Sequence, residues 1–411
     1  MALIDLFLAR AVKRGTLTLH RPGEASRTFG TPDPAFPDVT LRFADSRVGA
    51  SIVSDPGLGA AEAFMDGRLV IEGGDIRSLV ELLTANDPWE AGKSLLAASP
   101  LRRVAEKTAH TVGRRNMERA SKKNVAHHYD LSDRLYDLFL DRDRQYSCAY
   151  FTDPANSLEQ AQEDKKAHIA AKLLIEPGMR VLDIGCGWGG TALYLHAKTG
   201  AEVLGVTLSE EQLKVARRRA EEAGVADKVR FELIDYRHVT GTFDRIVSIG
   251  MFEHVGTKHY RTFFAKCREL LSDDGVMLLH TIGRMGAPGV TDKFTLKYIF
   301  PGGYNPALSE IVSAYEGLKL FPGDIEVLRL HYGWTIDRWY ERTVAAKSAI
   351  VDLYDERFFR LWTFYLAGAG AAFRNGGLCN YQIQLAKSRN AIPVTRDYIS
   401  AAEAKLRDGR S

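Results

Sequence analysis

Two titratable residues, Glu253 and His280, are the first candidates for chemistry in this sequence. Each stands near the end of a strand-like run, Glu253 after FDRIVSIG and His280 within GVMLLHTIG. A single glutamate or histidine is more often structural. Two of them at neighbouring strand ends, beside a glycine-rich turn, favour catalysis by groups that take up or release protons.

The glycine-rich run VLDIGCGWGG, residues 181–190, is typical of a buried strand that leads into a ligand-binding turn. Its glycines let the backbone approach a ligand where a Cβ would collide; they are Gly185, Gly187, Gly189 and Gly190. The spacing also satisfies the G-x-G-x-x-G pattern of dinucleotide sites, which expects an acidic residue about 20 positions further on. The next strand-like run, EVLGVTLS, ends without a carboxylate, so a nicotinamide cofactor is disfavoured.

The elements that must position these residues alternate regularly from residue 179 onward. Strand-like runs separated by helical runs predict a parallel α/β sheet with right-handed crossovers, whose ligands bind at the carboxyl ends of the strands. The candidate segments are therefore 185–190, 207–212, 235–237, 252–254 and 280–283. In the third of these, Asp235 and Tyr236 suit hydrogen bonding to an adenine and covering it. Further strands are expected within DIEVLRLHYG, residues 324–333, and within LCNYQIQLAK.

Two aromatic-rich regions flank this pattern. The segment QYSCAYF, residues 145–151, is too polar in its middle for plain core, so we expect it to fold back over a cofactor bound at the strand tips. The aromatic residues between Trp334 and Phe373 exceed what a sheet of this size needs to close its core. They predict either a tunnel for a long apolar chain or a tightly packed helical cap.

The composition is that of a soluble globular protein: 411 residues, 45% hydrophobic and 26% charged, with a net charge of only +3. Four widely separated cysteines, without C-x-x-C spacing, fit a reducing cytoplasm. No stretch reaches the roughly 18 apolar residues of a membrane span, so any membrane contact is expected to be peripheral. His127, His128 and Asp130 lack further ligands at useful spacing, and no metal site is predicted.

The N-terminal part predicts two regions before the catalytic domain. Residues 1–100 are expected to form a small α+β domain, in which AFMDGRLVIEGG and the following DIRSLVELL resemble the sterol-carrier-protein type of lipid-binding domain; an accessory domain without lipid is the alternative.

Residues 101–128 predict a basic helical linker, which could dock on anionic phospholipid with on the order of 1 kcal/mol per cation. A solvated helical face is the alternative. Nucleic acid is disfavoured, because no aromatic interleaving accompanies the cluster. Residues 129–411 are then the catalytic domain.

Several motifs in a fixed order carry a family resemblance: QYSCAYF, VLDIGCGWGG, GVTLSEEQ, DRIVSIGMFEHVG, LLHTIG, YIFPGGY and WYERT. They resemble the cyclopropane-fatty-acyl-phospholipid synthases, from about Asn124 to the C-terminus and more loosely over the whole chain. The resemblance implies a Rossmann-like class I sheet of the S-adenosylmethionine-dependent methyltransferase superfamily, with a helical acyl-chain cap. Enzymes of this type transfer a methylene group from S-adenosylmethionine to a cis double bond in the acyl chain of a membrane phospholipid.

The resemblance also implies roles for individual residues. Those that match the family's cofactor contacts are Tyr146, Ser147, Asp183, Gly185, Gly187, Gly189, Thr207, Leu208, Gln212, Tyr236 and Arg237. Those that match its bicarbonate site are Cys148, Glu253, His280, Ile282 and Tyr340. Methyl transfer to an alkene produces a carbocation, which needs a water-excluding pocket and a base that removes a proton. Bicarbonate can be that base if the five residues hold it, Cys148 and Ile282 through their backbone.

Alternatives stay open at this point. Relatives that modify mycolic acids lack the N-terminal extension, so the extension and the basic linker favour a bilayer phospholipid as substrate. Enzymes with the same core also leave a methyl or methylene branch instead of a ring. A non-catalytic lipid-binding protein is disfavoured by the intact motif residues, and a nucleic-acid methyltransferase by the aromatic cap. Relatives are often dimers, and we expect a homodimer in the cytoplasm, peripherally associated with the inner membrane face.

Overall fold

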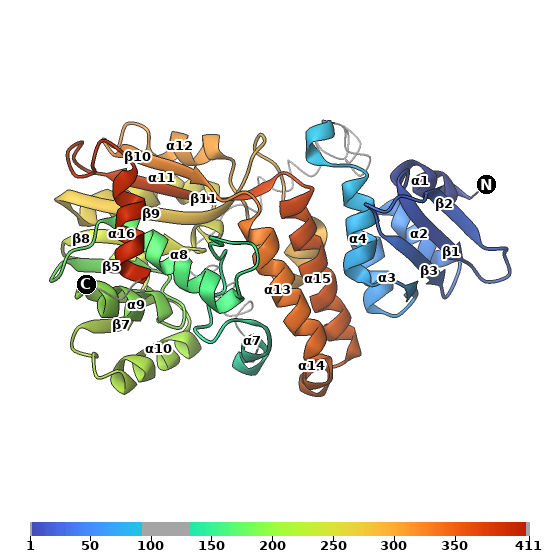
Figure 1. Cartoon of the computed structure of the whole chain (residues 1–411), viewed down its shortest axis with the longest axis horizontal. Helices are drawn as coiled ribbons and strands as arrows, with labels where there is room; N and C mark the ends of the chain where they lie inside the picture. Colours follow the sequence, from blue (N-terminus) through green and yellow to red (C-terminus); the bar gives the residue numbers. More distant parts are fainter. Residues whose placement is uncertain (1, 93–131, 408–411) are drawn as a thin grey trace. The chain divides into compact units, whose positions relative to one another are not determined.

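The computed structural model describes residues 2–92 and 132–407, which form two compact units (Figure 1). Among these residues, the first unit contains 2–92, 291–301 and 333–377, and the second unit contains 132–290, 302–332 and 378–407. The predicted boundaries near 100 and 128, and the basic linker between them, lie outside the described residues. The predicted division into domains therefore stays a prediction.

A seven-stranded sheet forms the centre of the second unit, in the order β10-β11-β9-β8-β5-β6-β7. The pairs from β7 to β9 are parallel, and β11 is antiparallel to both of its neighbours. The strands are β5 (Arg180–Ile184), β6 (Glu202–Thr207), β7 (Val229–Leu233), β8 (Phe243–Ile249), β9 (Leu271–Arg284), β10 (Phe321–Val327) and β11 (Leu378–Ala386). The parallel part is the α/β sheet predicted from the alternation of strand-like and helical runs.

Helices cover both faces of this sheet. The helices of the second unit are α7 (Asp133–Phe139), α8 (Leu158–Leu173), α9 (Gly190–Thr199), α10 (Glu210–Glu222), α11 (Tyr260–Leu270), α12 (Leu308–Tyr315) and α16 (Asp397–Arg407). Leu278 on β9 belongs to the apolar core shared with α8, α9 and α10, whereas the next residue, Leu279, belongs to the core shared with α11 and α12. Both faces of the central strands are buried, which explains their continuous apolar runs.

The turn between β5 and α9 depends on glycine. Gly185, Gly187 and Gly189 have φ values of 84°, 55° and 83°, a region that residues with a Cβ rarely adopt. A Cβ on Gly185 would lie 2.9 Å from Cβ of Met251. The same turn begins α9 directly at Gly190, so the strand, the turn and the helix follow one another without an intervening loop.

The first unit contains a four-stranded mixed sheet in the order β2-β1-β3-β4. Its strands are β1 (Gly15–His20), β2 (Arg27–Thr31), β3 (Asp38–Phe43) and β4 (Leu69–Gly73). Its helices are α1 (Leu3–Ala11), α2 (Arg47–Ser54), α3 (Pro56–Met65), α4 (Ile76–Ala85), α13 (His331–Ala345, from residue 333), α14 (Lys347–Leu353) and α15 (Glu356–Arg374). The resemblance of this region to a sterol-carrier-protein domain stays a prediction.

The late aromatic residues belong largely to the first unit. Trp339 on α13 and Trp362 and Phe373 on α15 are buried, which fits the tightly packed alternative for these three. The short helix Thr295–Ile299 adds Phe294 and Ile299 to an apolar cluster with α3 and α15. None of the helices within residues 2–92 and 132–407 has the length and apolar character needed to cross a bilayer.

Candidate active site

A pocket with about 860 Å³ of space, open solvent included, lies at the carboxyl ends of the parallel strands of the second unit. It is lined by residues that follow β5, β6, β7 and β8, which is where ligands of such sheets bind. The predicted cofactor residues among them are Gly185, Gly187, Thr207, Leu208, Gln212, Tyr236 and Arg237. The sheet thus brings together residues that are more than 50 positions apart in the sequence.

Polar side chains in this pocket are held by one another. Thr207 Oγ1 donates a hydrogen bond to Gln212 Oε1 at 3.1 Å, which fixes both at the end of β6. Arg237 donates from Nε and Nη2 to the two carboxylate oxygens of Asp235, at 2.8 and 2.6 Å. Burial opposes the ionised form of Asp235, but these bonds outweigh it and lower the pKa of that carboxyl. The acid expected to meet an adenine is therefore an ionised group already paired with Arg237.

Two histidines also line the pocket: His254, which ends the candidate segment 252–254, and His259, which sequence reasoning missed. Burial lowers the pKa of His254 to about 4, so its ring is neutral near pH 7. It follows Glu253 directly, and its place at a strand end beside that candidate catalytic residue was the signal in the sequence.

Asp183, the acid that precedes the glycine turn, is 2% exposed. Its Oδ2 atom has no hydrogen-bond partner among the described residues, and burial raises the pKa of the carboxyl to about 7. An unsatisfied buried carboxylate oxygen costs free energy unless a cation or a donor reaches it. Asp183 therefore fits a ligand that carries an ammonium group.

In the segment Gln145–Cys148, Tyr146 is half-buried and the other three residues are buried. Tyr146 packs edge-on against Tyr136, with ring centroids 5.5 Å apart, and Ser147 is 7% exposed. Burial raises the pKa of the Cys148 thiol well above its usual range, so the thiolate is not populated near neutral pH. A protonated thiol is a poor nucleophile, so a covalent role for Cys148 is disfavoured.

Tyr150 and Phe151, which end the predicted segment 145–151, are held by aromatic stacking and a hydrogen bond. Tyr150 stacks on His168 and on His331, with centroid distances of 4.2 and 5.0 Å. The backbone N–H of Phe151 donates to Nδ1 of His331 at 2.9 Å, and burial lowers the pKa of His331 to about 4. A neutral ring can accept this bond.

Glu253 and Ile282, two residues of the predicted bicarbonate site, are in direct contact. The backbone N–H of Ile282 on β9 donates to Glu253 Oε1 at 2.6 Å. The other oxygen, Oε2, is buried and has no partner within the part of the chain that is described. Burial is the largest influence on Glu253 and raises its pKa to about 7. A carboxyl that titrates near neutrality and has a free oxygen can accept or donate a proton there.

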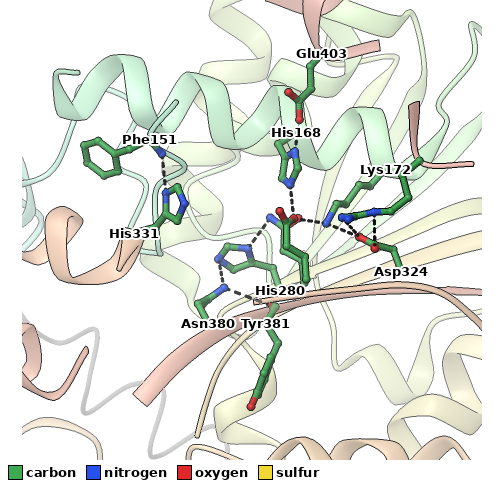
Figure 2. A network of polar contacts seen from close by, with 12 residues as sticks. Phe151, His168, Lys172, His280, Asp324, His331, Asn380, Tyr381 and Glu403 are labelled. Atoms are coloured by element: carbon green, nitrogen blue, oxygen red, sulfur yellow. Dashed lines mark hydrogen bonds and ion pairs between the residues drawn. The ribbon is translucent and has the colours of Figure 1, made fainter. Parts of the chain in front are cut away.

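His280 lies on the same strand, between two amides of β11 (Figure 2). Its Nε2 is 3.1 Å from Asn380 Nδ2, and its Nδ1 is 3.2 Å from Gln382 Nε2. Burial lowers the pKa of His280 well below its usual value, so the ring is neutral. A neutral imidazole has one donor and one acceptor, so one of the two amides must turn its oxygen toward the ring. Sequence reasoning missed both amides.

A cluster of ionisable residues lies close to His280 (Figure 2). His168 on α8 contacts Glu326 on β10 at 2.6 Å and also Glu403 on α16. Lys172 forms an ion pair with Asp324 at 2.9 Å. No local pattern in the sequence marks this cluster, because its members come from three elements that are separated by up to 235 positions.

Tyr340, the fifth predicted member of the bicarbonate site, belongs to the first unit. Its hydroxyl donates to Asp75 Oδ2 at 3.1 Å, and the guanidinium of Arg77 lies 4.8 Å from its ring centroid. Its membership of the reacting centre stays a prediction.

The raised pKa of Glu253 predicts a measurable effect on stability. Between the pKa of an unfolded glutamate, 4.5, and about 7, only the folded state keeps the proton, so stability falls as the pH rises through this window. Glu253→Gln removes that loss, and we expect the variant to exceed the wild type at pH 8 by on the order of a few kcal/mol. Thermal unfolding of both proteins from pH 4.5 to 8 checks this. Asp183 titrates in the same range in both proteins, so the difference curve isolates Glu253; parallel curves would contradict the prediction.

Known proteins are similar to this chain in sequence and in fold. The profile of the mycolic acid cyclopropane synthetase family matches residues 116–383. The cyclopropane-fatty-acyl-phospholipid synthase of Escherichia coli strain K12 is 42% identical over 294 residues, which cover 70% of this chain and 75% of that protein. A probable fatty acid methyltransferase of Pseudomonas putida is 36% identical over 347 residues, 82% of this chain and 84% of the relative.

Solved structures agree with these relatives. The mycolic acid cyclopropane synthase CmaA1, complexed with SAH and CTAB, superimposes with a TM-score of 0.62 at 35% identity and covers 65% of this chain and 98% of that one. The predicted class I methyltransferase sheet is thereby confirmed. The chain is an enzyme of the S-adenosylmethionine-dependent methyltransferase superfamily and belongs to the mycolic acid cyclopropane synthetase family.

Proposed function

We propose that this enzyme transfers a methylene group from S-adenosylmethionine to a cis double bond in the acyl chain of a phospholipid and so forms a cyclopropane ring. The observation that carries the proposal is the contact between Glu253 and Ile282 at the end of β9, in the same unit as the glycine-lined pocket. A cofactor pocket alone would fit any methyltransferase. Glu253 adds a buried group that can take part in proton transfer.

The residues around the pocket fit S-adenosylmethionine. Tyr236 offers an aromatic face for the adenine. Asp183 is not itself among the lining residues but directly precedes Ile184, which is, and its uncommitted oxygen suits the ammonium of the methionine part. Thr207 and Gln212 offer a hydroxyl and an amide for the ribose at the tip of β6. When bound, S-adenosylmethionine supplies an electrophilic methyl group on a sulfonium. The related structure that holds SAH and CTAB, a detergent with a long alkyl chain, supports both a nucleoside ligand and an alkyl ligand.

The residues predicted for bicarbonate fit an anion in part. Glu253 with a pKa near 7 can be protonated and donate a hydrogen bond from its free oxygen, and a neutral His280 does not repel an anion. The N–H of Ile282 is already bound to Glu253, so an anion would have to share or replace that contact. When bound, bicarbonate supplies a base that can remove the proton released on ring closure. Tyr340 and the backbone of Cys148 complete the proposed set.

The membrane part of the proposal has its support in the sequence. The basic residues between 101 and 128 and the sterol-carrier-like pattern before them favour peripheral binding to an anionic bilayer on the cytoplasmic side. We include a homodimer, because two membrane-binding domains on one bilayer would gain avidity.

A direct assay tests the function. Purified protein, S-adenosylmethionine and vesicles of a cis-unsaturated phosphatidylglycerol should yield S-adenosylhomocysteine together with a cyclopropane acyl chain, identified by mass spectrometry of the lipid. A parallel incubation with free oleic acid separates phospholipid from fatty acid as the acceptor. Unchanged lipid in both incubations would refute the proposal.

A second candidate is transfer that leaves a methyl or methylene branch. The relative in Pseudomonas putida, described as a probable fatty acid methyltransferase, favours this alternative, since its match covers more of the chain than that of the synthase from Escherichia coli. The same lipid analysis decides between them, because a ring and a branch give different fragmentation patterns.

A further inference from the structure

Three polar residues of α8 contact residues 143–147, which precede this helix in the chain. Gln162, Lys165 and Lys166 are spaced i, i+3 and i+4, so they share one face of the helix. Their exposed fractions are 1%, 0% and 5%. Polar and charged side chains are almost never buried to this extent unless they are committed to specific partners.

Lys165 and Gln162 have their hydrogen-bond partners in residues 143–147, and Lys166 pairs with Asp143 in the same segment as well as with Glu163 on α8. Lys165 Nζ donates to Gln145 Oε1 at 2.6 Å and to Ser147 Oγ at 2.9 Å. Gln162 Nε2 donates to the carbonyl oxygens of the same two residues, at 3.2 and 3.0 Å. Lys166 forms an ion pair with Asp143 at 2.8 Å. One face of α8 therefore fixes both the backbone and the side chains of this segment.

The segment is in turn joined to the glycine turn. The carboxylate of Asp143 lies so close to Gly190 that a Cβ there would be 2.4 Å from its Oδ2. Arg219 on α10 contacts Asp143 and also donates to the carbonyl oxygen of Trp188 at 3.0 Å. A displacement of residues 143–147 would thus reach the turn that lines the pocket.

Lys165 differs from Lys166 because it has no carboxylate partner among the described residues. Both of its hydrogen-bond acceptors are neutral, and within the described part of the chain it forms no ion pair. A fully buried ammonium without a carboxylate partner is costly, and an apolar side chain of similar size would be cheaper for stability. Packing alone does not account for a lysine at this position.

We propose that Lys165 is a positioning residue, which holds Gln145 and Ser147 so that the segment Gln145–Cys148 can close on the cofactor. The inference rests on the proposed function, because it takes Tyr146 and Ser147, two of the predicted cofactor residues, to contact S-adenosylmethionine when that cofactor is bound. The sequence pattern QEDKK reads as an exposed helix surface, and only the structure shows that this lysine faces inward.

The protonation of Lys165 gives the inference a readout that packing lacks. Burial lowers the pKa of Lys165 to about 8, so the ammonium loses its charge as the pH rises from 7 to 9, and charge-assisted hydrogen bonds are the stronger ones. The ionisable groups that influence it, or that it influences, come from the neighbouring segment, α8, β5 and β9: Asp141, Asp143, Cys148, Lys166, Asp183 and His280. The carboxylates among them favour the charged lysine, and burial and Lys166 oppose it.

The test is calorimetric titration of the full-length protein with S-adenosylhomocysteine at pH 7 and pH 9. We compare the wild type with Lys165→Met and with Lys214→Met, a control at a lysine whose side chain is 68% exposed. At pH 7 we expect the Kd of Lys165→Met to rise at least tenfold and that of the control to stay within twofold. From pH 7 to 9 the wild type should lose affinity by several-fold more than Lys165→Met, since titration of the ligand's own amine is common to both. In turnover assays the KM for S-adenosylmethionine should rise more than kcat falls.

The outcomes separate the two proposals. Equal Kd values and equal pH trends in the wild type and Lys165→Met would overturn the inference. A wild type that binds S-adenosylhomocysteine but modifies no lipid would refute the proposed acyl substrate and still test Lys165, and a wild type that does not bind it would overturn both. If Lys165→Met does not fold, Gln145→Leu removes the other acceptor of Lys165, at a residue outside the predicted cofactor set, and should raise Kd by a few-fold; an unchanged Kd in that variant would count against the inference.

Discussion

Glu253→Gln is expected to lower the turnover of acyl chains by roughly 10²–10⁴-fold, the range that general acid–base catalysis contributes. Glutamine keeps the size of the side chain and can keep the hydrogen bond from the Ile282 N–H, which is 2.6 Å long in the wild type. It cannot take up or release a proton from the buried position that raises the pKa of Glu253 to about 7. Initial rates with vesicle substrate measure the effect.

Cofactor binding should survive this substitution, because Glu253 is not among the residues that line the glycine pocket. The Kd for S-adenosylhomocysteine is therefore expected to stay within about threefold, well under the 1.4 kcal/mol that a tenfold change represents. Glu269→Gln, at a side chain that is 66% exposed on α11, is the matched control and should retain full activity. Wild-type turnover in Glu253→Gln would remove this residue from the catalytic set.

Gly187→Ala is expected to weaken S-adenosylhomocysteine by roughly 10–100-fold, which corresponds to the 1–3 kcal/mol that overpacking costs. Gly187 lines the pocket, and a Cβ there would meet no protein atom within 4 Å. The new methyl group would therefore enter the volume available to the ligand without clashing with other atoms of the protein. Calorimetric titration gives the change in Kd.

The control for this prediction is Gly178→Ala. Gly178 also has a positive φ, 81° against 55° for Gly187, and its Cβ would likewise meet nothing within 4 Å, but it lies outside the pocket. Both variants carry the cost of an alanine in the left-handed region, about 1–2 kcal/mol, so both should unfold at lower temperature. A Gly178→Ala protein with an equally weakened Kd would show that backbone strain, and not pocket space, causes the loss.

The pocket residues could be predicted because their signals are local. Apolar runs that end in glycine or in Thr207 and Leu208 mark strand ends, and a parallel sheet collects strand ends at one edge. The structure places Gly185, Gly187 and Gln212 in one pocket accordingly. The same rule led to Glu253, whereas Ile282 was named only through the family resemblance; the contact of these two residues joins the turn after β8 to the end of β9.

What the sequence could not show depends on partners that are distant in the chain. The strand expected at residues 324–333 ends at Val327, and α13 begins at His331. β10 is an edge strand with little burial, so no apolar pattern marks where it stops, and His331 is fixed by Phe151, 180 positions away. Lys165 escaped notice for the same reason, because nothing in a helix rich in charged residues distinguishes a buried lysine from an exposed one.

The most direct test of the central claim uses S-adenosylmethionine with a fully deuterated methyl group. If a proton is removed from the transferred methyl, as the proposed role of Glu253 and bicarbonate requires, the modified acyl chain carries two of the three deuterium atoms in a ring that resists mild hydrogenation. We predict this result with cis-unsaturated phospholipid vesicles. An acyl chain that retains all three deuterium atoms, as a methyl branch, would contradict the account.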